Sequence, residues 1–457
     1  MIGQNFLNLM IPSVSHYWLQ NAQVPACLLA GVSPSVLAQQ NQEGLVSVHL
    51  EILSGGITQI LPAIPMHVGE TPVVNCQGKQ VWPWFIDCHT HLDKGHIWSR
   101  APNPDGTFDS ALKTAIEDSQ NWHPEDLYRR MEFGLKCSYA HGTQAIRTHL
   151  DSTGSLAQTS WDVFQTLQYQ WQDRITLQAV SLVPLADFLT PMGEKLADRV
   201  AECQGILGGV AYMNPEIDRQ LDRVFTLAKE RQLDLDFHTD ENGDPESITL
   251  RKVAKAAIRH DFSGQIVCGH CCSLAVQSPE TGEHTLQLVK QAGIGIISLP
   301  LCNLYLQDRQ YTGATTVVHL NDQPITPVWR GITRLHEIKR QGIPLAIASD
   351  NCRDPFFGFG DHDVLEVFNQ GVRIGHLDQP YGDWPQIVTQ TPADLMKLPK
   401  IGKISLGNAA DLIIFKGRSF SELLARPQAD RFLLRKGKLI HSLLPDYQEL
   451  DDLMNHP

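Results

Sequence analysis

The chain has 457 residues, of which 42% are hydrophobic and 19% charged, as in globular proteins with a substantial core. Its formal net charge of −13 argues against non-specific nucleic-acid binding, which needs a basic face to displace the counterions of the phosphates. No apolar run approaches the ~20 residues of a membrane span, and the N-terminus lacks the basic segment of a secretion signal. The ten cysteines are scattered, which favours reduced thiols over a disulfide scaffold. We therefore expect a cytoplasmic protein without nucleic-acid or membrane partners.

The two ends of the chain share a β-type pattern. Short apolar runs such as LVSVHLEIL near the N-terminus, and ADLIIFKG and RFLLRKGKLIHS near the C-terminus, alternate with glycines and show little helical periodicity. We expect residues 1–82 and 405–457 to form one small β-sandwich-like domain from both chain ends, beside a larger domain of residues 83–404.

The strongest local signal is FIDCHTHLDKG at residues 85–95, where an apolar, β-prone run leads to His89 and His91. Residues two apart in a strand point to the same face, so both imidazoles can reach one cation. The alternative is a pair of polar residues leaving a strand, because so short a motif also occurs without a metal.

Further along the chain, amphipathic helical patterns alternate with short β-rich runs. IDRQLDRVFTLAKERQ predicts a helix and precedes the strand LDLDFH, which ends at His238. SITLRKVAKAAIRH predicts the next helix, and the strand GQIVCGH then ends at His270. A third pair, GITRLHEIKRQG and IPLAIASD, ends at Asp350.

Each of these three strands therefore ends on a residue that can bind a metal or move a proton. Active sites of (β/α)₈ barrels are assembled at this end of the strands, and the alternation of helix and strand indicates an α/β protein with a parallel sheet. We expect residues 83–404 to form a (β/α)₈ TIM-type barrel. Glu241 follows His238 by three residues, where a carboxylate can shuttle a proton beside a metal. The alternative for Glu241 is a surface turn, because DENGDPES is turn-forming.

The order of these motifs resembles the amidohydrolase superfamily, with His-x-His, then a His followed by Glu, then a further His and an Asp. More closely, the chain is similar to the cytosine deaminase family, which includes aminohydrolases acting on triazine rings. The similarity extends from residue 20 to the C-terminal β segment and is carried by long strings, which are QNAQVP, RTHLD, LPLCNLYLQDR, WRGITRLHEI and SDNCRDPFFGFGDHD.

The resemblance implies one divalent metal, zinc or iron, bound by four side chains, His89, His91, His238 and Asp350. It implies that metal-bound hydroxide attacks a ring carbon, with Asp350 beside it, Glu241 as the proton shuttle and His270 as a polarising or orienting group. Imidazole and carboxylate ligands suit either metal. No lysine stands at a strand end between His91 and His238, so we expect one metal rather than two bridged by a carboxylated lysine.

The substrate site departs from the pattern of cytosine deaminases, which place a glutamine after an apolar strand. That position falls here on Pro184 or Leu185, neither of which offers the donor and acceptor of an amide, so cytosine itself is doubtful. The expected substrate contacts are Leu185, Asn351, Arg353, Asp354 and Phe356. Lys94 is a further candidate, and its alternative is an ordinary loop lysine.

The expected function is that of a hydrolytic deaminase, which releases ammonia from an amino-substituted N-heterocycle. This small-molecule substrate is the one partner that we expect. One alternative is a hydrolase of a substituted amine or a cyclic amide on the same scaffold. Another is a metal- or ligand-binding protein without turnover, against which Glu241 and His270 argue. Arg147 and His149 stand at an apparent strand end, where they could line the pocket, although a structural role is the favoured interpretation. We expect a surface or helical position for His362. The sequence leaves the oligomeric state open, a homo-oligomer included.

Overall fold

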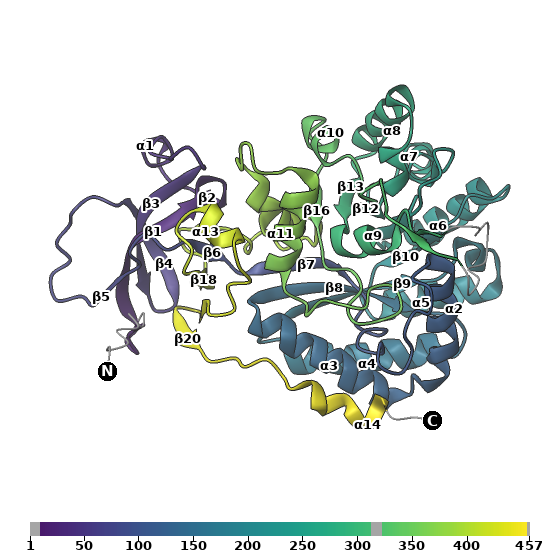
Figure 1. Ribbon diagram of the computed structural model, residues 1–457, viewed down its shortest axis with the longest axis horizontal. Helices are drawn as coiled ribbons and strands as arrows, with labels where there is room; N and C mark the ends of the chain where they lie inside the picture. Colours follow the sequence, from purple (N-terminus) through teal and green to yellow (C-terminus); the bar gives the residue numbers. More distant parts are fainter. Residues whose placement is uncertain (1–9, 312–321, 455–457) are drawn as a thin grey trace. The chain divides into compact units, whose positions relative to one another are not determined.

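The computed structural model describes residues 10–311 and 322–454, which fall into two compact units (Figure 1). Unit 1 runs to Ile86 and resumes with His376–Leu443, and unit 2 comprises Asp87–Gly375 and resumes at Leu444. The sequence placed the boundaries at 82/83 and 404/405 and grouped the C-terminal residues with the chain ends. The observed division also assigns residues 83–86 and 376–404 to unit 1, and it assigns residues 444–454 to unit 2.

Unit 1 is built mainly from two four-stranded sheets, ordered β4-β3-β1-β5 and β20-β19-β18-β6. The second sheet joins distant parts of the chain, because β18 pairs antiparallel with both β6 and β19. Trp82 is fully buried and makes edge contacts with Phe85, Phe415 and Phe420. The strands are β1 (His16–Pro25), β2 (Leu29–Ala30), β3 (Leu45–Leu53), β4 (Gly56–Pro62), β5 (Val73–Asn75), β6 (Val81–Pro83), β17 (Ile404–Ser405), β18 (Leu412–Ile414), β19 (Phe432–Arg435) and β20 (Lys438–Ile440). The helical segments are η1 (Ala26–Leu28), α1 (Pro34–Leu37), η5 (Trp384–Val388), α12 (Gln390–Leu395) and α13 (Phe420–Leu424).

Unit 2 has the α/β architecture that the sequence predicted. A three-stranded sheet is ordered β7-β8-β9, and a five-stranded sheet, ordered β10-β11-β12-β13-β16, has only parallel pairings. Isolated parallel bridges between the two sheets join Val180 to Ile206 and Thr90 to Asp350. The strands are β7 (Phe85–Thr90), β8 (Thr143–Asp151), β9 (Thr176–Leu182), β10 (Leu207–Ala211), β11 (Leu235–Thr239), β12 (Ile266–His270), β13 (Gly295–Ser298) and β16 (Leu345–Ile347), with a small ribbon of β14 (Gln310–Tyr311) and β15 (Pro324–Ile325).

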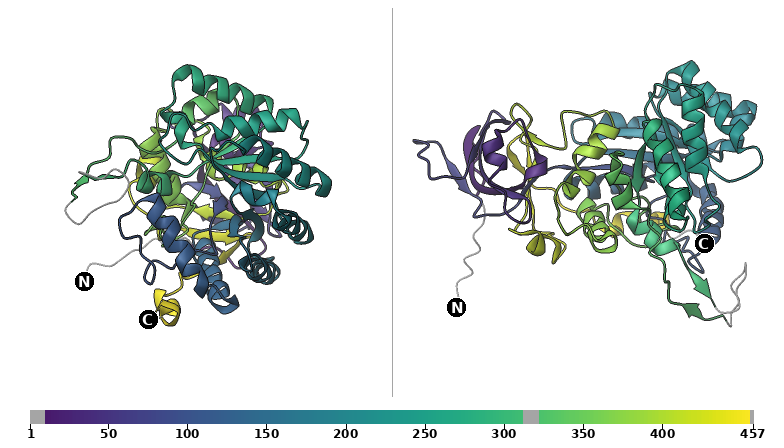
Figure 2. Two further views of the ribbon diagram at one scale, coloured as in Figure 1. Left: turned by 90° about the vertical axis from the view of Figure 1, so that its right-hand side faces the viewer. Right: turned by 90° about the horizontal axis from the view of Figure 1, so that it is seen from above.

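Helices alternate with these strands and surround them (Figure 2, left panel). The expected amphipathic faces are buried, as in α6, where Leu221, Val224, Phe225 and Ala228 are all inaccessible to solvent. Among the described residues, no helix combines the length and apolar character needed to cross a membrane. The helices are α2 (Phe108–Asp118), α3 (Pro124–Ala140), α4 (Leu156–Trp171), α5 (Pro191–Glu202), α6 (Ile217–Arg231), α7 (Thr249–Arg259), α8 (Pro279–Gln291), α9 (Pro300–Leu306), α10 (Leu335–Arg340), α11 (Val364–Gly375) and α14 (Asp451–Met454). Shorter turns are η2 (Ser119–Asn121), η3 (Leu185–Leu189), η4 (Cys272–Ala275) and η6 (Tyr447–Leu450).

The third predicted helix–strand pair is shorter than expected. Helix α10 begins at Leu335 rather than near Gly331, which has a φ of 74° and passes so close to Asn303 that an added Cβ would lie 2.5 Å from its carbonyl oxygen. Strand β16 ends at Ile347, before Asp350. Asp350 has a φ of 65°, a left-handed conformation that is uncommon outside glycine.

Two hydrogen-bonded contacts nevertheless fix the register between β7 and the segment after β16. The Asp350 backbone N–H donates to the His89 carbonyl at 2.9 Å. The buried Asp87 carboxylate accepts from the Ser349 backbone N–H at 3.1 Å and from its hydroxyl at 2.5 Å. Asp350 is therefore held beside the strand that carries His89, although it lies outside a strand itself.

Candidate active site

Four buried side chains meet at the carboxyl ends of the strands of unit 2. Asp350 Oδ1 lies 3.2 Å from His91 Nε2 and 3.6 Å from His89 Nε2. His238 Nε2 lies 3.3 Å from His91 Nε2. With metal–nitrogen distances of ~2.0–2.1 Å, tetrahedral ligands lie roughly 3.3 Å apart, so these spacings suit one cation. The four residues named by the resemblance are thus brought together.

The local sequence explains how these side chains converge. His89 is in β7 and His91 follows one residue beyond its end, so the alternation of an extended chain turns both rings the same way. His238 is in β11, the strand next to β12. Gly269 in β12 leaves space for the His89 ring, because a Cβ at this glycine would lie 2.9 Å from His89 Cε1.

The polar atoms of this cluster fit a cation better than they fit one another. Both Asp350 oxygens and Nε2 of His89 are buried without a hydrogen-bond partner. Such orphaned atoms are rare in native proteins and often indicate a missing ion. Burial, followed by the neighbouring charged groups, lowers the pKa of all three histidines well below the ordinary value. They are therefore neutral, which is the form that binds metal.

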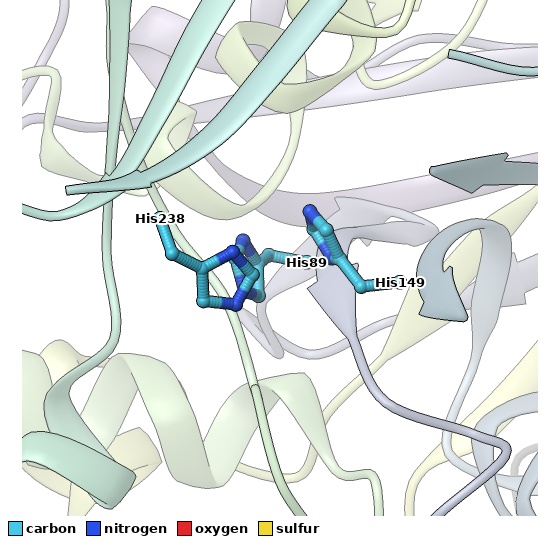
Figure 3. Close-up of side chains that lie close together, drawn as sticks. All are labelled: His89, His149 and His238. Atoms are coloured by element: carbon cyan, nitrogen blue, oxygen red, sulfur yellow. The ribbon is translucent and has the colours of Figure 1, made fainter. Parts of the chain in front are cut away.

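His149 belongs to the same group of imidazoles. It extends from β8 toward His89 of β7 and His238 of β11 (Figure 3). Its ring centroid lies 3.9 Å from that of His89, and one nitrogen of each of the three rings lies within 4.8 Å of the others. Asp236 lies 3.4 Å from His149 Nε2 and also pairs with Arg147 at 3.0 Å. The sequence favoured a structural role for His149 and left a position in the pocket wall open, and the structure places its ring next to those of His89 and His238, among the candidate ligands.

Glu241 and His270 lie next to this group. Glu241 Oε1 is 3.2 Å from His270 Nδ1, and the amide nitrogen of Asn303 is 3.0 Å from the same nitrogen. An amide that donates to Nδ1 leaves the ring proton on Nε2, which has no protein partner. Burial, followed by the charge of Asp350, raises the pKa of Glu241 well above its ordinary value. Burial lowers the pKa of His270 to about 3.

Two neighbouring carboxylates after β11, those of Asp240 and Glu241, make different contacts. Asp240 accepts the backbone N–H groups of Thr249 at 2.6 Å and Leu250 at 3.0 Å, which stabilises the start of α7. Glu241 takes no part in this turn and instead lines the cavity described next. The turn-forming sequence is therefore present, and it leaves the Glu241 side chain at the cavity.

A cavity of about 930 Å³ opens onto the candidate metal ligands. His91, His238, Glu241, His270 and Asp350 form its polar part. Its other walls come from α2, η2, the start of α4 and the segment after β9, with the residues Phe108, Leu112, Ile116, Trp122, Leu156, Val183, Pro184 and Tyr212 among them. A cavity of this size with apolar walls and a few convergent polar groups is typical of a small-molecule site.

The expected substrate contacts divide into two groups. Lys94, Asn351 and Phe356 line the cavity, and Lys94 donates to Asp151 Oδ1 at 2.8 Å. Leu185, Arg353 and Asp354 do not line it. Leu185 is buried against β10, where an added Cβ on Gly209 would lie 2.9 Å from its Cδ2, and Pro184 takes its place in the wall.

The remaining two residues support the segment after β16. Asp354 accepts from the Asn351 amide at 2.7 Å and from the Phe356 backbone N–H at 2.8 Å. The Arg353 guanidinium stacks over the Tyr447 ring at 4.5 Å. Asp354 therefore orients two lining residues without lining the cavity, and Arg353 anchors the adjacent backbone.

Residues 157–441 match the amidohydrolase family. The pterin deaminase of Rhizobium rhizogenes (strain K84) is 46% identical over 447 residues, which cover 97% of this chain and 98% of that protein. The chain belongs to the amidohydrolase family. This amidohydrolase is also 23% identical to the N-isopropylammelide isopropyl amidohydrolase of Pseudomonas sp. (strain ADP), over 80% of this chain and 87% of that protein.

The fold of this amidohydrolase is shared with the 5-methylcytosine deaminase of Klebsiella pneumoniae, solved with 5-fluorocytosine. The TM-score is 0.76 at 23% identity, with 94% of this chain and 98% of that chain covered. The superfamily expected from the motifs is confirmed, and so is the expected class of enzyme, a hydrolase acting on carbon–nitrogen bonds.

Proposed function

We propose that this amidohydrolase is a hydrolytic deaminase whose substrates are pterins or closely similar bicyclic aminoheterocycles. The observation that carries the proposal is the 46% identity to a pterin deaminase along nearly the whole of both chains. Water replaces the exocyclic amino group of the substrate ring, and ammonia leaves. The apolar cavity supports this substrate class, because its volume exceeds what one six-membered ring would fill.

We assign one divalent metal, zinc or iron, to His89, His91, His238 and Asp350. What supports the assignment is the set of short distances between these side chains and their unpartnered buried atoms. A metal bound there would supply a water molecule whose pKa is lowered from 15.7 to about 7.

Glu241 and His270 handle the proton and the polar groups of the substrate in this proposal. The raised pKa of Glu241 favours a carboxyl that holds a proton and can deliver it to the ring nitrogen next to the reacting carbon. His270 directs its Nε2–H toward the reacting centre, because Asn303 occupies Nδ1. Asn303 is thus a positioning residue in the proposed site.

Substrate selection is proposed to rest on Lys94, Asn351 and Phe356, which are supported by their position in the cavity wall. Pro184, in the wall, has no side-chain group that could form hydrogen bonds with the amide edge of a pyrimidine. Cytosine is accordingly not the proposed substrate. Leu185, Arg353 and Asp354 are proposed to influence binding only through the residues they pack against or hydrogen-bond.

The strands of unit 2 are proposed to form a (β/α)₈ barrel. Support comes from the three-stranded and five-stranded sheets together with the bridges from Val180 to Ile206 and from Thr90 to Asp350. The strands of unit 1 are proposed to form the small β domain expected from both chain ends.

Ammonia release from pterin by the purified, metal-loaded enzyme tests the proposal. We expect turnover of pterin at least tenfold better in kcat/KM than of guanine, 5-methylcytosine or cytosine. Isopropylamine release from N-isopropylammelide, without ammonia release from any aminoheterocycle, would favour the substituted-amine hydrolase instead. Silence on every substrate with full metal occupancy would contradict both enzymatic proposals.

A further inference from the structure

A second group of buried metal-binding side chains lies outside the candidate active site. His96 follows β7, Cys352 follows β16 by five residues, and His362 precedes α11. Their exposed fractions are only 5%, 2% and 3%. One nitrogen of each imidazole and the Cys352 sulfur lie within 4.8 Å of one another. The sequence placed His362 at the surface or on a helix, so its burial is a correction.

The two imidazoles repeat the geometry of the candidate active site. His96 Nε2 lies 3.1 Å from His362 Nε2, just as His91 Nε2 lies 3.3 Å from His238 Nε2. In all four rings Nδ1 is buried without a hydrogen-bond partner. The same chain therefore contains two pairs of neutral, buried histidines whose Nε2 atoms face each other.

Either a hydrogen bond or a cation could hold the two imidazoles together. One Nε2–H would donate to the other Nε2, which then forces the acceptor ring to carry its proton on Nδ1. Both arrangements leave a buried Nδ1–H without an acceptor, so the presence of a third donor decides between them. A cation between the two rings uses both lone pairs, and the Cys352 sulfur provides a third donor close by.

The surroundings supply charge of both signs. Asp361 accepts from His141 at 2.9 Å and from the Tyr447 hydroxyl at 3.2 Å, and its charge faces His362 and Cys352. Arg353 lies on the other side, near His96 and Cys352.

We propose that His96, Cys352 and His362 form a second metal site that binds a borderline or soft divalent cation of the zinc class. Two imidazoles and one thiolate make up a ligand set that zinc accepts, with a fourth position left for water. Hard cations such as Mg²⁺ and Ca²⁺ are excluded, because they prefer oxygen ligands.

The position of this site gives it a structural task. His96 lies five residues after His91, and Cys352 lies two residues after Asp350. The His96 backbone N–H already donates to the Cys352 carbonyl at 3.0 Å. A metal here would fasten the two loops that carry candidate ligands of the first site. The inference does not depend on the identity of the substrate.

Metal content and the spectrum of the cobalt-substituted enzyme test the proposal. The purified full chain should bind two Zn²⁺ per molecule, and the Co²⁺ form should show a near-ultraviolet thiolate-to-cobalt band. Cys352→Ser should reduce the content to one metal and abolish the band. Cys76→Ser is the matched control, because Cys76 is a fully buried thiol of unit 1 that belongs to no candidate group of metal ligands, so both readouts should stay unchanged. Cys302→Ser tests the other buried thiol that lies with candidate ligands, Asp350 and Glu241, and should leave the thiolate band in place.

X-ray absorption of the zinc-loaded wild type gives a readout that needs no variant. It should contain a sulfur shell at ~2.3 Å. One metal per chain, with no sulfur shell and no thiolate band, would overturn the proposal and leave the histidines as a hydrogen-bonded pair. A band lost in Cys302→Ser but retained in Cys352→Ser would also overturn it. Neither result decides whether the enzyme deaminates pterin, which the ammonia assay tests on its own.

Discussion

Glu241 Oε1 lies 3.2 Å from Nδ1 of His270, and Asn303 reaches the same nitrogen at 3.0 Å. One ring nitrogen makes one strong hydrogen bond at a time, so the bond from Asn303 leaves the Glu241 carboxyl able to turn toward a substrate. Glu241 after β11, His270 at the end of β12 and Asn303 in α9 thus share one small network beside the candidate metal ligands.

Glu241→Gln should lower kcat for pterin by about 10²–10⁴-fold, because an amide cannot transfer a proton between water and the ring nitrogen. Metal content should be unchanged, since Glu241 is not among the four residues proposed to bind the ion. Steady-state ammonia release and metal analysis of the same preparation measure both quantities. A variant that turned over at the wild-type rate would remove Glu241 from the reaction.

Asn303→Ala should lower kcat about 10–100-fold with a smaller change in KM, because the His270 ring would lose the partner that fixes its proton on Nε2. Asn303→Asp should lower kcat further than Asn303→Ala does. A carboxylate accepts a hydrogen bond from Nδ1–H and therefore favours the tautomer of His270 that has no proton on Nε2. Leu304→Ala is the control, a neighbouring position on α9 whose side chain is 40% exposed. Equal losses for alanine and aspartate at position 303 would contradict the tautomer argument.

The sequence predicted much of the candidate centre because its residues follow a simple rule. Parallel strands gather their carboxyl ends at one edge, so His238 and His270 were found from helix–strand alternation alone. The role of Asn303 was missed because it lies within α9, five residues after the end of β13, where a rule about strand ends does not reach.

Other errors came from turns that a residue count cannot resolve. The sequence left two candidates, Pro184 and Leu185, for the position that holds a glutamine in cytosine deaminases. The backbone after β9 places Pro184 in the cavity wall and Leu185 in the core. His362 was expected at the surface or on a helix, yet it is buried and its Nε2 lies 3.1 Å from His96 Nε2. His96 and His362 are 266 residues apart, and a contact between such distant segments produces no hydrophobic periodicity in the sequence of either one.

Lys94→Met should raise KM for pterin about 10–100-fold with a smaller effect on kcat. A hydrogen bond to a charged group contributes roughly 1.5–3 kcal/mol, and the Lys94 ammonium lines the cavity 5.4 Å from the Phe356 ring. Lys113→Met is the control, since its side chain is 77% exposed on α2. Lys94 also forms an ion pair with Asp151, so thermal unfolding must show that both variants are folded at the assay temperature. An unchanged KM would exclude Lys94 as a substrate contact.

Arg100→Gln should destabilise the folded enzyme by about 3–5 kcal/mol, because it breaks a buried ion network that holds the end of α2 to α3. The Arg100 guanidinium donates to both oxygens of Asp118 at 2.9 Å and to Asp126 at 2.5 Å. Helix α2 supplies part of the cavity wall, so activity should fall as well. Arg129→Gln is the control, because its partner Asp452 is 67% exposed and solvent screens the pair, so the free energy of unfolding should change much less than in Arg100→Gln.

The same network predicts a pH dependence with a definite sign. Burial alone would raise the pKa of Asp126, but Arg130 and Arg100 outweigh it and hold the pKa below the ordinary 3.8. A carboxyl whose folded-state pKa is depressed stabilises the fold fully above its unfolded pKa and loses that stabilisation as the pH falls through the folded value. The difference in unfolding free energy between wild type and Arg100→Gln should therefore be constant from about pH 5 to 7 and shrink below about pH 4. Urea unfolding across this range measures it, and a difference that grew on acidification would show that Asp126 does not depend on Arg100.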